Sequence, residues 1–224
     1  TNTEIIEKFS SPKMIDLDGN AVYPGLIDGH CHFYGLGLQK LLKADLVGTG
    51  SYEDVLRRIR QHSEKIPEGW LQGRGWDQND WENQEFPDRD ELDGLFPDRP
   101  VLLIRIDGHA ALANAKALEM AGIDKTTKVE GGEVRMGNGR ITGILIDNAI
   151  NLVTKVIPEP SDKQIAQALK EAENICFSAG LTSVVDAGLD KKIIASIDSL
   201  QKEGKLKMRI NAMISPSEEN LQHY

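Results

Sequence analysis

Apolar runs and amphipathic stretches alternate along the chain. The segment YPGLIDGHCH, residues 23–32, predicts a buried strand, and RPVLLIRID, residues 99–107, predicts another with both faces covered. Between them, residues 51–66 carry an apolar face at helical spacing, with Ser51 as the N-cap and Asp54 at the capping-box position. This alternation predicts parallel strands joined by helices that pack outside the sheet.

The second half of the chain repeats the alternation. Residues 161–180 and 190–204 predict helices, and residues 181–188 and 206–214 predict strands. The order predicts an α/β fold. An open doubly wound sheet and part of a closed (β/α)8 barrel both fit this spacing.

The middle of the chain departs from the simple alternation. Residues 70–77 predict a short strand, and residues 109–122, HAALANAKALEMAG, predict a helix ended by Gly122. A Gly-Asn-Gly turn within residues 129–143 predicts a β-hairpin inserted into the alternation.

The two ends of the chain suggest a piece of a longer protein. The sequence has no initiator Met. Its first 22 residues predict the last strands of a small sheet, with a turn at Gly19-Asn20. At the other end, SPSEE after residue 214 predicts the start of a helix. We therefore expect a fragment, which either associates with another copy of the chain through its open sheet edges or is only partly ordered.

Charge and cysteine content exclude several classes of protein. Lys and Arg number 26 against 35 Asp and Glu, a net charge of -9, which argues against nucleic-acid and anionic-membrane binding. No signal peptide and no apolar run of membrane-spanning length is apparent. The two cysteines, Cys31 and Cys176, are far apart, so a reducing cytoplasmic location is expected.

His30 and His32 are candidate metal ligands. Residues at i and i+2 on a strand point to the same face, so both imidazoles can reach one ion, while Cys31 points away. The pair follows an apolar run, at the strand edge where barrel active sites lie. The alternative is a surface pair of histidines that binds nothing.

Three further residues follow apolar runs. His109 comes directly after Asp-Gly, as His30 does, and is expected at the same sheet edge unless it only caps the following helix. Asp147 and Asp186 stand at strand ends. Three alternative roles fit each carboxylate: a metal ligand, a partner that orients a histidine, or the N-cap of the following helix.

The segment GRGWDQNDW, residues 73–81, gathers aromatic and polar side chains in a turn. We expect Trp76 and Asp77 to line a substrate pocket there and Trp70 to anchor the loop on the core. A serine or cysteine hydrolase is disfavoured because no Gly-x-Ser-x-Gly motif occurs, and the phosphate-loop motif is also missing.

With these motifs in hand, the chain resembles the amidohydrolase superfamily, and within it the N-substituted formamide deformylase-like branch. VYPGLIDGHCH is similar to the first-strand signature of the superfamily. The later blocks GRGWDQNDW, PVLLIRIDGHAALANAKAL, GRITGILIDNA and GLTSVVDAG resemble those of the branch, in order. The likeness runs from about residue 15 to residue 214.

The resemblance implies a partial (β/α)8 TIM-like barrel with one or two divalent metals, usually zinc. Residues 1–22 would be the remnant of a β-sandwich domain, and residues 23–224 the first part of the barrel, with an insertion at about 70–145. His30 and His32 match metal ligands of the family. His109 matches a position that either faces the substrate or lies behind the metal ligands.

The resemblance also implies a reaction. A metal-activated water would hydrolyse a non-peptide C–N bond of a small amide or N-formyl substrate. Two histidines are fewer ligands than catalytic zinc usually has, so the isolated chain is expected to be inactive. The alternatives are a non-catalytic α/β module that binds a small molecule, and a cyclic amidase or deaminase of the same superfamily.

Overall fold

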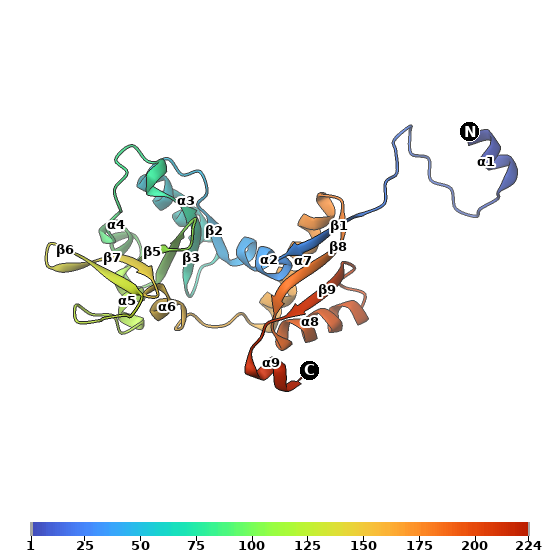
Figure 1. Cartoon of the computed structure of the whole chain (residues 1–224). Helices are drawn as coiled ribbons and strands as arrows, with labels where there is room; N and C mark the ends of the chain where they lie inside the picture. The colour runs from blue at the N-terminus through green and yellow to red at the C-terminus, as the bar shows by residue number, and fades with distance from the viewer. Residues whose placement is uncertain (1, 224) are drawn as a thin grey trace.

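The computed structural model describes residues 2–223 and shows two lobes (Figure 1). The three-stranded lobe contains a parallel sheet of strand order β1-β8-β9. Its strands are β1 (Leu26–Cys31), β8 (Leu181–Leu189) and β9 (Arg209–Ile214). The helices of this lobe are α2 (Phe33–Leu42), α7 (Asp162–Ser178), α8 (Lys191–Lys202) and α9 (Glu218–His223).

Side chains from α2, α7 and α8 pack on one face of the three-stranded sheet. The core there includes Phe33, Leu169, Val184 and Ile193. The N-cap of α7 is Ser161, which forms the predicted capping box with Gln164. The predicted helix at 190–204 is likewise present as α8.

The first strand differs from its prediction. Residues 23–32 were expected to be buried, but β1 is the edge strand of its sheet, and Leu26 and Ile27 are 60% and 72% exposed. Its only strand neighbour within residues 2–223 is β8. An apolar run is typical of a strand covered on both faces. Leu26 and Ile27 point to opposite faces, so both faces of β1 are open at its start in the described chain.

The six-stranded lobe contains a mixed sheet of order β2-β3-β4-β5-β7-β6. Strands β2, β3 and β4 run parallel, and the pairings beyond β4 are antiparallel. Its strands are β2 (Lys43–Asp45), β3 (Leu71–Trp76), β4 (Val101–Arg105), β5 (Ala110–Ala113), β6 (Gly132–Gly137) and β7 (Arg140–Asp147). The single parallel sheet expected from the alternation is thus replaced by two sheets.

One long helix, α3, and several short ones accompany the six-stranded sheet. They are α3 (Tyr52–Lys65), the 3-10 turn η1 (Gln78–Asp80), α4 (Asp90–Leu95), α5 (Ala115–Met120) and α6 (Ile150–Thr154). The Ser51 side chain accepts a hydrogen bond from the N–H of Asp54 at 3.2 Å, which confirms the predicted start of α3.

The predicted hairpin is confirmed. Strands β6 and β7 pair antiparallel around Asn138 and Gly139, whose φ angles are +50° and +73°. Two successive positive φ angles are typical of the tight hairpin turn that Asn-Gly favours. Strand β7 then continues to Asp147, which places that residue beside the strand β5.

The helix predicted over residues 109–122 is wrong in its first half. Residues 110–113 form the buried strand β5, and helix α5 begins only after Asn114. The Asn114 side chain accepts hydrogen bonds from the N–H groups of Ala117 and Val101, so it caps α5 and joins it to β4. Alanine has a high helix propensity, but pairing between two apolar strands outweighs it here.

The strands expected in the first 22 residues are also not formed. Among residues 2–22 the structure contains a short helix, α1 (Asn2–Lys8), and an extended segment that leads away from both lobes (Figure 1). The turn lies at Asp18 and Gly19, one residue earlier than predicted. None of the helices within residues 2–223 combines the length and the apolar character that crossing a bilayer requires.

Candidate functional site

His30 and His32 lie at the carboxyl end of β1. His30 is within the strand, and His32 is the N-cap residue of α2. Their ring centroids are 5.8 Å apart with the planes at 80°, and both residues are exposed. The sequence expectation that the two imidazoles share one edge of the sheet is met.

A hydrogen bond fixes the orientation of the His32 ring. Its Nδ1 lies 3.0 Å from the carbonyl oxygen of Ala187, which belongs to β8. A carbonyl oxygen only accepts, so Nδ1 carries a proton and donates, and in a neutral ring Nε2 then keeps its lone pair. In histidines that bind a metal through one ring nitrogen, the N–H of the other commonly donates a hydrogen bond to such an oxygen.

The chemistry of this pair therefore fits a divalent metal in part. His30 and His32 are able to supply two imidazole ligands. Within residues 2–223, however, no three or more His, Cys, Asp or Glu side chains are arranged to hold an ion together. A complete catalytic zinc site usually has three protein ligands, so the described residues provide an incomplete set.

Asp186 lies next to the histidine pair but has another partner. Its side chain is buried, and Oδ2 accepts a hydrogen bond from the N–H of Tyr34 at 2.9 Å. It thereby caps the first turn of α2 from the neighbouring strand, rather than the helix that follows it in sequence. Burial raises the pKa of this carboxyl, against the opposing effects of the Tyr34 N–H and of His32.

Cys31 packs against the core of the three-stranded lobe, as expected for a residue that points away from its histidine neighbours. Burial, together with the charges of Asp186 and Asp28, raises the pKa of its thiol to about 11. The thiol is therefore protonated at neutral pH, which disfavours a cysteine nucleophile.

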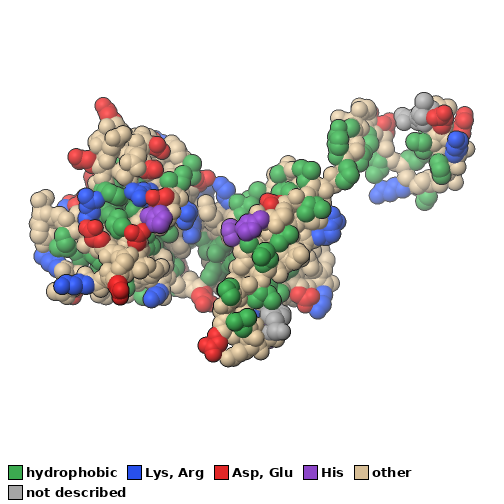
Figure 2. All heavy atoms as spheres, in the orientation of Figure 1, with side chains coloured by type: hydrophobic (Ala, Val, Ile, Leu, Met, Phe, Trp, Pro, Cys, Tyr) green, Lys and Arg blue, Asp and Glu red, His purple; other side chains and the backbone are tan. Residues whose placement is uncertain are grey.

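His109 and Asp147 lie in the six-stranded lobe, not beside His30 and His32. His109 follows β4 and Asp147 ends β7, and Nδ1 of the histidine is 2.7 Å from Oδ1 of the carboxylate. The expectation that His109 shares the edge of β1 is therefore wrong, because β4 belongs to the other sheet. The histidine side chains in view gather at two places, one over each lobe (Figure 2).

Trp76 is a core residue, which corrects the expectation that it lines a pocket. Its side chain is 1% exposed, and its indole N–H donates to the carbonyl oxygen of Leu103 at 2.9 Å. Asp77 caps η1, with Oδ1 accepting from the N–H of Asn79 at 3.0 Å. Trp70 is buried as an anchor, as expected.

Two aspartates that the sequence analysis did not single out hold the backbone of the candidate histidines. Asp28 Oδ1 accepts from the N–H of His30, and Asp107 Oδ1 accepts from the N–H of His109, each at 3.0 Å. Both stand in an Asp-Gly-His triplet. An Asp that bonds the backbone two residues on is a known turn signal, so the repeated triplet was the available clue.

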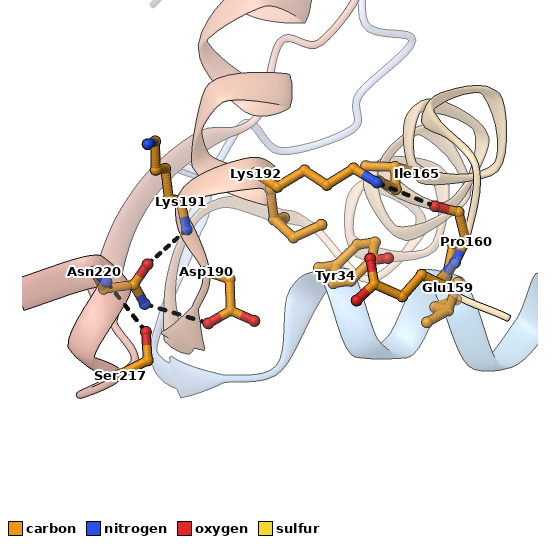
Figure 3. A pocket seen from close by; sticks show the side chains of 11 residues that line it. Tyr34, Glu159, Pro160, Ile165, Asp190, Lys191, Lys192, Ser217 and Asn220 are labelled. Atoms are coloured by element: carbon orange, nitrogen blue, oxygen red, sulfur yellow. Dashed lines mark hydrogen bonds between the residues drawn. The ribbon is translucent and has the colours of Figure 1, made fainter. Parts of the chain in front are cut away.

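A cavity of about 540 Å³ lies beside the first turns of α2, α7 and α8 (Figure 3). Tyr34, Glu159 and Lys192 are among the residues that line it. The buried Asn220 closes one side, accepting from the N–H of Lys191 and donating to Asp190 and the carbonyl of Ser215. None of the predicted site residues is among those lining this cavity.

Comparison with known proteins agrees with this architecture. A solved structure of an uncharacterized metal-dependent hydrolase from Pyrococcus horikoshii OT3 superimposes with a TM-score of 0.65 at 27% identity. That match covers 85% of this chain and 36% of the solved chain. The α/β fold is therefore similar to that of a metal-dependent hydrolase.

Curated relatives are similar in sequence. The putative amidohydrolase YtcJ of Bacillus subtilis (strain 168) is 39% identical over 181 residues, which cover 79% of this chain and 34% of the relative. The N-substituted formamide deformylase of Arthrobacter pascens is 30% identical over 188 residues, which cover 80% of this chain and 35% of the relative. The chain thus spans about a third of the length of these relatives.

The family model of the amidohydrolases matches residues 13–223, which include both lobes and the histidine pair. The matched range agrees with the resemblance seen in the sequence motifs. The chain belongs to the amidohydrolase family.

Proposed function

We propose that this chain is part of a metal-dependent hydrolase that cleaves a non-peptide C–N bond of a small amide. The observation that carries the proposal is the contact between His32 Nδ1 and the Ala187 carbonyl. It presents Nε2 as a ligand at the carboxyl ends of β1 and β8. That edge of a parallel sheet is where α/β enzymes place their active sites.

His30 and His32 would hold a divalent metal, for which zinc is our choice because imidazole suits it. When bound, such a metal lowers the pKa of water toward neutrality and polarises a carbonyl group. The residues of this chain orient the site: Asp28 fixes the backbone at His30, and Ala187 fixes the ring of His32. We propose that the remaining ligands come from the two thirds of the protein that the relatives have in addition.

We further propose that β1, β8 and β9 are strands of a (β/α)8 barrel. Supporting this, the three strands are parallel neighbours, and a helix follows each of them in the chain. The six-stranded lobe, residues 43–147, would then be an insertion between the first two of these strands. The assignment of residues 1–22 to a β-sandwich domain has no support from α1.

The substrate class is proposed from the relatives. An amide or N-formyl substrate is supported by the likeness to N-substituted formamide deformylase. His109 and Asp77 stay proposed substrate-side residues, at the carboxyl ends of β4 and β3. A cytoplasmic location agrees with the two free thiols.

The experiment measures zinc content and hydrolysis on the full-length protein, with panels of N-formyl amides and cyclic amides. We expect stoichiometric metal and turnover of open-chain amides. The double variant His30→Ala, His32→Ala should lose both, whereas His62→Gln, a histidine of α3 bonded to the Leu42 carbonyl, should lose neither. Turnover only of cyclic amides would favour the cyclic amidase, and ligand binding without metal would favour a binding module.

A further inference from the structure

His109 has an exposed side chain, and the residue makes three hydrogen bonds, two through its backbone and one through its ring. Its backbone N–H donates to Asp107 Oδ1 at 3.0 Å, and its carbonyl accepts from the N–H of Asp147 at 3.0 Å. Its ring Nδ1 lies 2.7 Å from Asp147 Oδ1. The side chain is 72% exposed, so the ring is accessible to a ligand while its Nδ1 contacts Asp147.

A guanidinium supports the first of these contacts. Arg105 donates to both carboxylate oxygens of Asp107, at 3.0 Å and 2.6 Å, in a fork geometry. The Asp107 carboxylate is thereby held in place while it binds the backbone of His109. Hydrogen bonding to Arg105 also lowers the pKa of Asp107, despite partial burial, so the carboxylate remains ionised.

Asp147 has a left-handed backbone conformation. Its φ is +48°, in a region that aspartate adopts more readily than most residues with a side chain. Here the conformation places the carboxylate against His109 at the end of β7, while Asp147 N–H also bonds to the same histidine.

The contact determines the tautomer of the ring. An ionised carboxylate only accepts hydrogen bonds, so the neutral ring carries its proton on Nδ1. The opposite nitrogen, Nε2, then has a free lone pair that points away from Asp147. A neutral imidazole in this state accepts a hydrogen bond from an N–H group.

We propose that Asp147 is a positioning residue that holds His109 in the Nδ1–H tautomer, so that Nε2 accepts a hydrogen bond from the N–H of an amide substrate. The substrate part of this inference rests on the proposed function. The positioning part rests only on contacts within the six-stranded lobe. The ligand class that fits is therefore a secondary amide or formamide, which has an N–H, rather than a tertiary one.

The positioning part is tested on this chain with nitrogen-15-labelled histidine by NMR. The His109 ring should show the Nδ1–H tautomer, and Asp147→Asn should shift it toward Nε2–H. Asp147→Gly removes the carboxylate and tolerates the positive φ, so it should have the same effect. His62, whose Nε2 lies 3.1 Å from the Leu42 carbonyl, is the internal reference and should not change. An unchanged His109 tautomer in both variants would overturn the positioning role.

The substrate part is tested on the full-length enzyme with matched secondary and tertiary formamides. Asp147→Asn and His109→Gln should lower kcat/KM for the secondary substrate by about 10- to 100-fold, the range for losing a partner that orients a histidine. The tertiary substrate should be affected much less. Equal losses on both substrates would overturn the N–H contact. A full-length enzyme that hydrolyses no amide would overturn the proposed function and the substrate part, while the tautomer would still decide the positioning role.

Discussion

The ring Nδ1 of His32 lies 3.0 Å from the carbonyl oxygen of Ala187, which joins the end of β1 to the end of β8. The two residues are 155 positions apart in the chain, yet β1 and β8 are neighbours in the sheet. The contact engages Nδ1 and leaves Nε2 to a ligand, in a ring whose centroid lies 5.8 Å from that of His30. Metal-binding histidines commonly have one ring N–H bonded to a carbonyl oxygen in this way, so the contact favours a ligand role for His32.

The first prediction concerns zinc binding by this chain. Titration of the chain with zinc, followed by calorimetry, should show weak binding, because two imidazoles leave most of the ion solvated. His32→Ala should weaken zinc affinity by at least about tenfold. Losing a residue that only hydrogen-bonds to a metal ligand already costs about that much. His62→Gln is the matched histidine control and should bind as the unchanged chain does. If the double variant His30→Ala, His32→Ala bound zinc as tightly as the unchanged chain, the two histidines would not be the ligands.

Features set by neighbouring residues were predictable from the sequence. The start of α3 at Ser51 and the hairpin at Asn138-Gly139 depend on contacts within a few residues, and both were predicted correctly. The position of His30 and His32 at the strand edge likewise followed from the apolar run directly before them.

Features set by pairing between distant segments were not predictable. The split into two sheets depends on which strands become neighbours, and the alternation alone does not specify that. His109 and Asp147 meet because β5 and β7 pair in one register, although they are 38 residues apart. Trp76 is buried in the core of the six-stranded lobe, where its indole N–H donates to the Leu103 carbonyl on β4. The turn-rich sequence around it does not predict this contact.

The second prediction concerns Glu173, a buried carboxylate on α7 that is 2% exposed. One oxygen accepts from the N–H groups of Lys207 and Met208, the latter at 2.9 Å, and the other pairs with Lys170. Glu173→Gln should lower the free energy of unfolding by about 1–3 kcal/mol, because the amide keeps one acceptor oxygen for the two N–H groups but loses the charged oxygen that pairs with Lys170. Urea denaturation measures this, and Glu171→Gln, exposed on the same helix, should change it little. Equal effects of the two variants would contradict a structural role for Glu173.

The third prediction concerns pH and His62. Burial lowers the pKa of this imidazole, although the Leu42 carbonyl opposes the shift. The folded pKa thus lies below the unfolded value of about 6.5. As pH falls below about 6.5, the unfolded chain takes up the proton first, so stability decreases until the folded pKa is passed. Above about pH 6.5 the contribution is complete.

His62→Gln should remove this part of the pH dependence. The slope attributable to one proton is at most about 1.4 kcal/mol per pH unit. Urea denaturation at pH 5, 6 and 7.5 compares the two proteins, and the difference between their unfolding free energies should change only below about pH 6.5. A constant difference across the three pH values would show that His62 titrates alike in the folded and unfolded chain.

The last prediction concerns two glycines of α2 that differ in their surroundings. A Cβ at Gly37 would overlap the carbonyl oxygen of Ala168 on α7 and come within 3.1 Å of the Ala172 Cβ. A Cβ at Gly35 would meet only the His32 Cβ, at 3.5 Å, an ordinary contact. Gly37→Ala should therefore force α2 and α7 apart and lower the free energy of unfolding by about 1–3 kcal/mol, the usual cost of overpacking.

Gly35→Ala is the matched control, because the same chemical change is made one half-turn away in the same helix. There the gain in helix propensity is not opposed by a clash, so unfolding should require about 0.5–1 kcal/mol more. If the free energy of unfolding, measured by urea denaturation, falls for Gly37→Ala and rises for Gly35→Ala, close packing of α2 on α7 at Gly37 is supported. Stabilisation by both would show that the helices are further apart than the contact at Ala168 requires, and that Gly37 is not needed for the crossing.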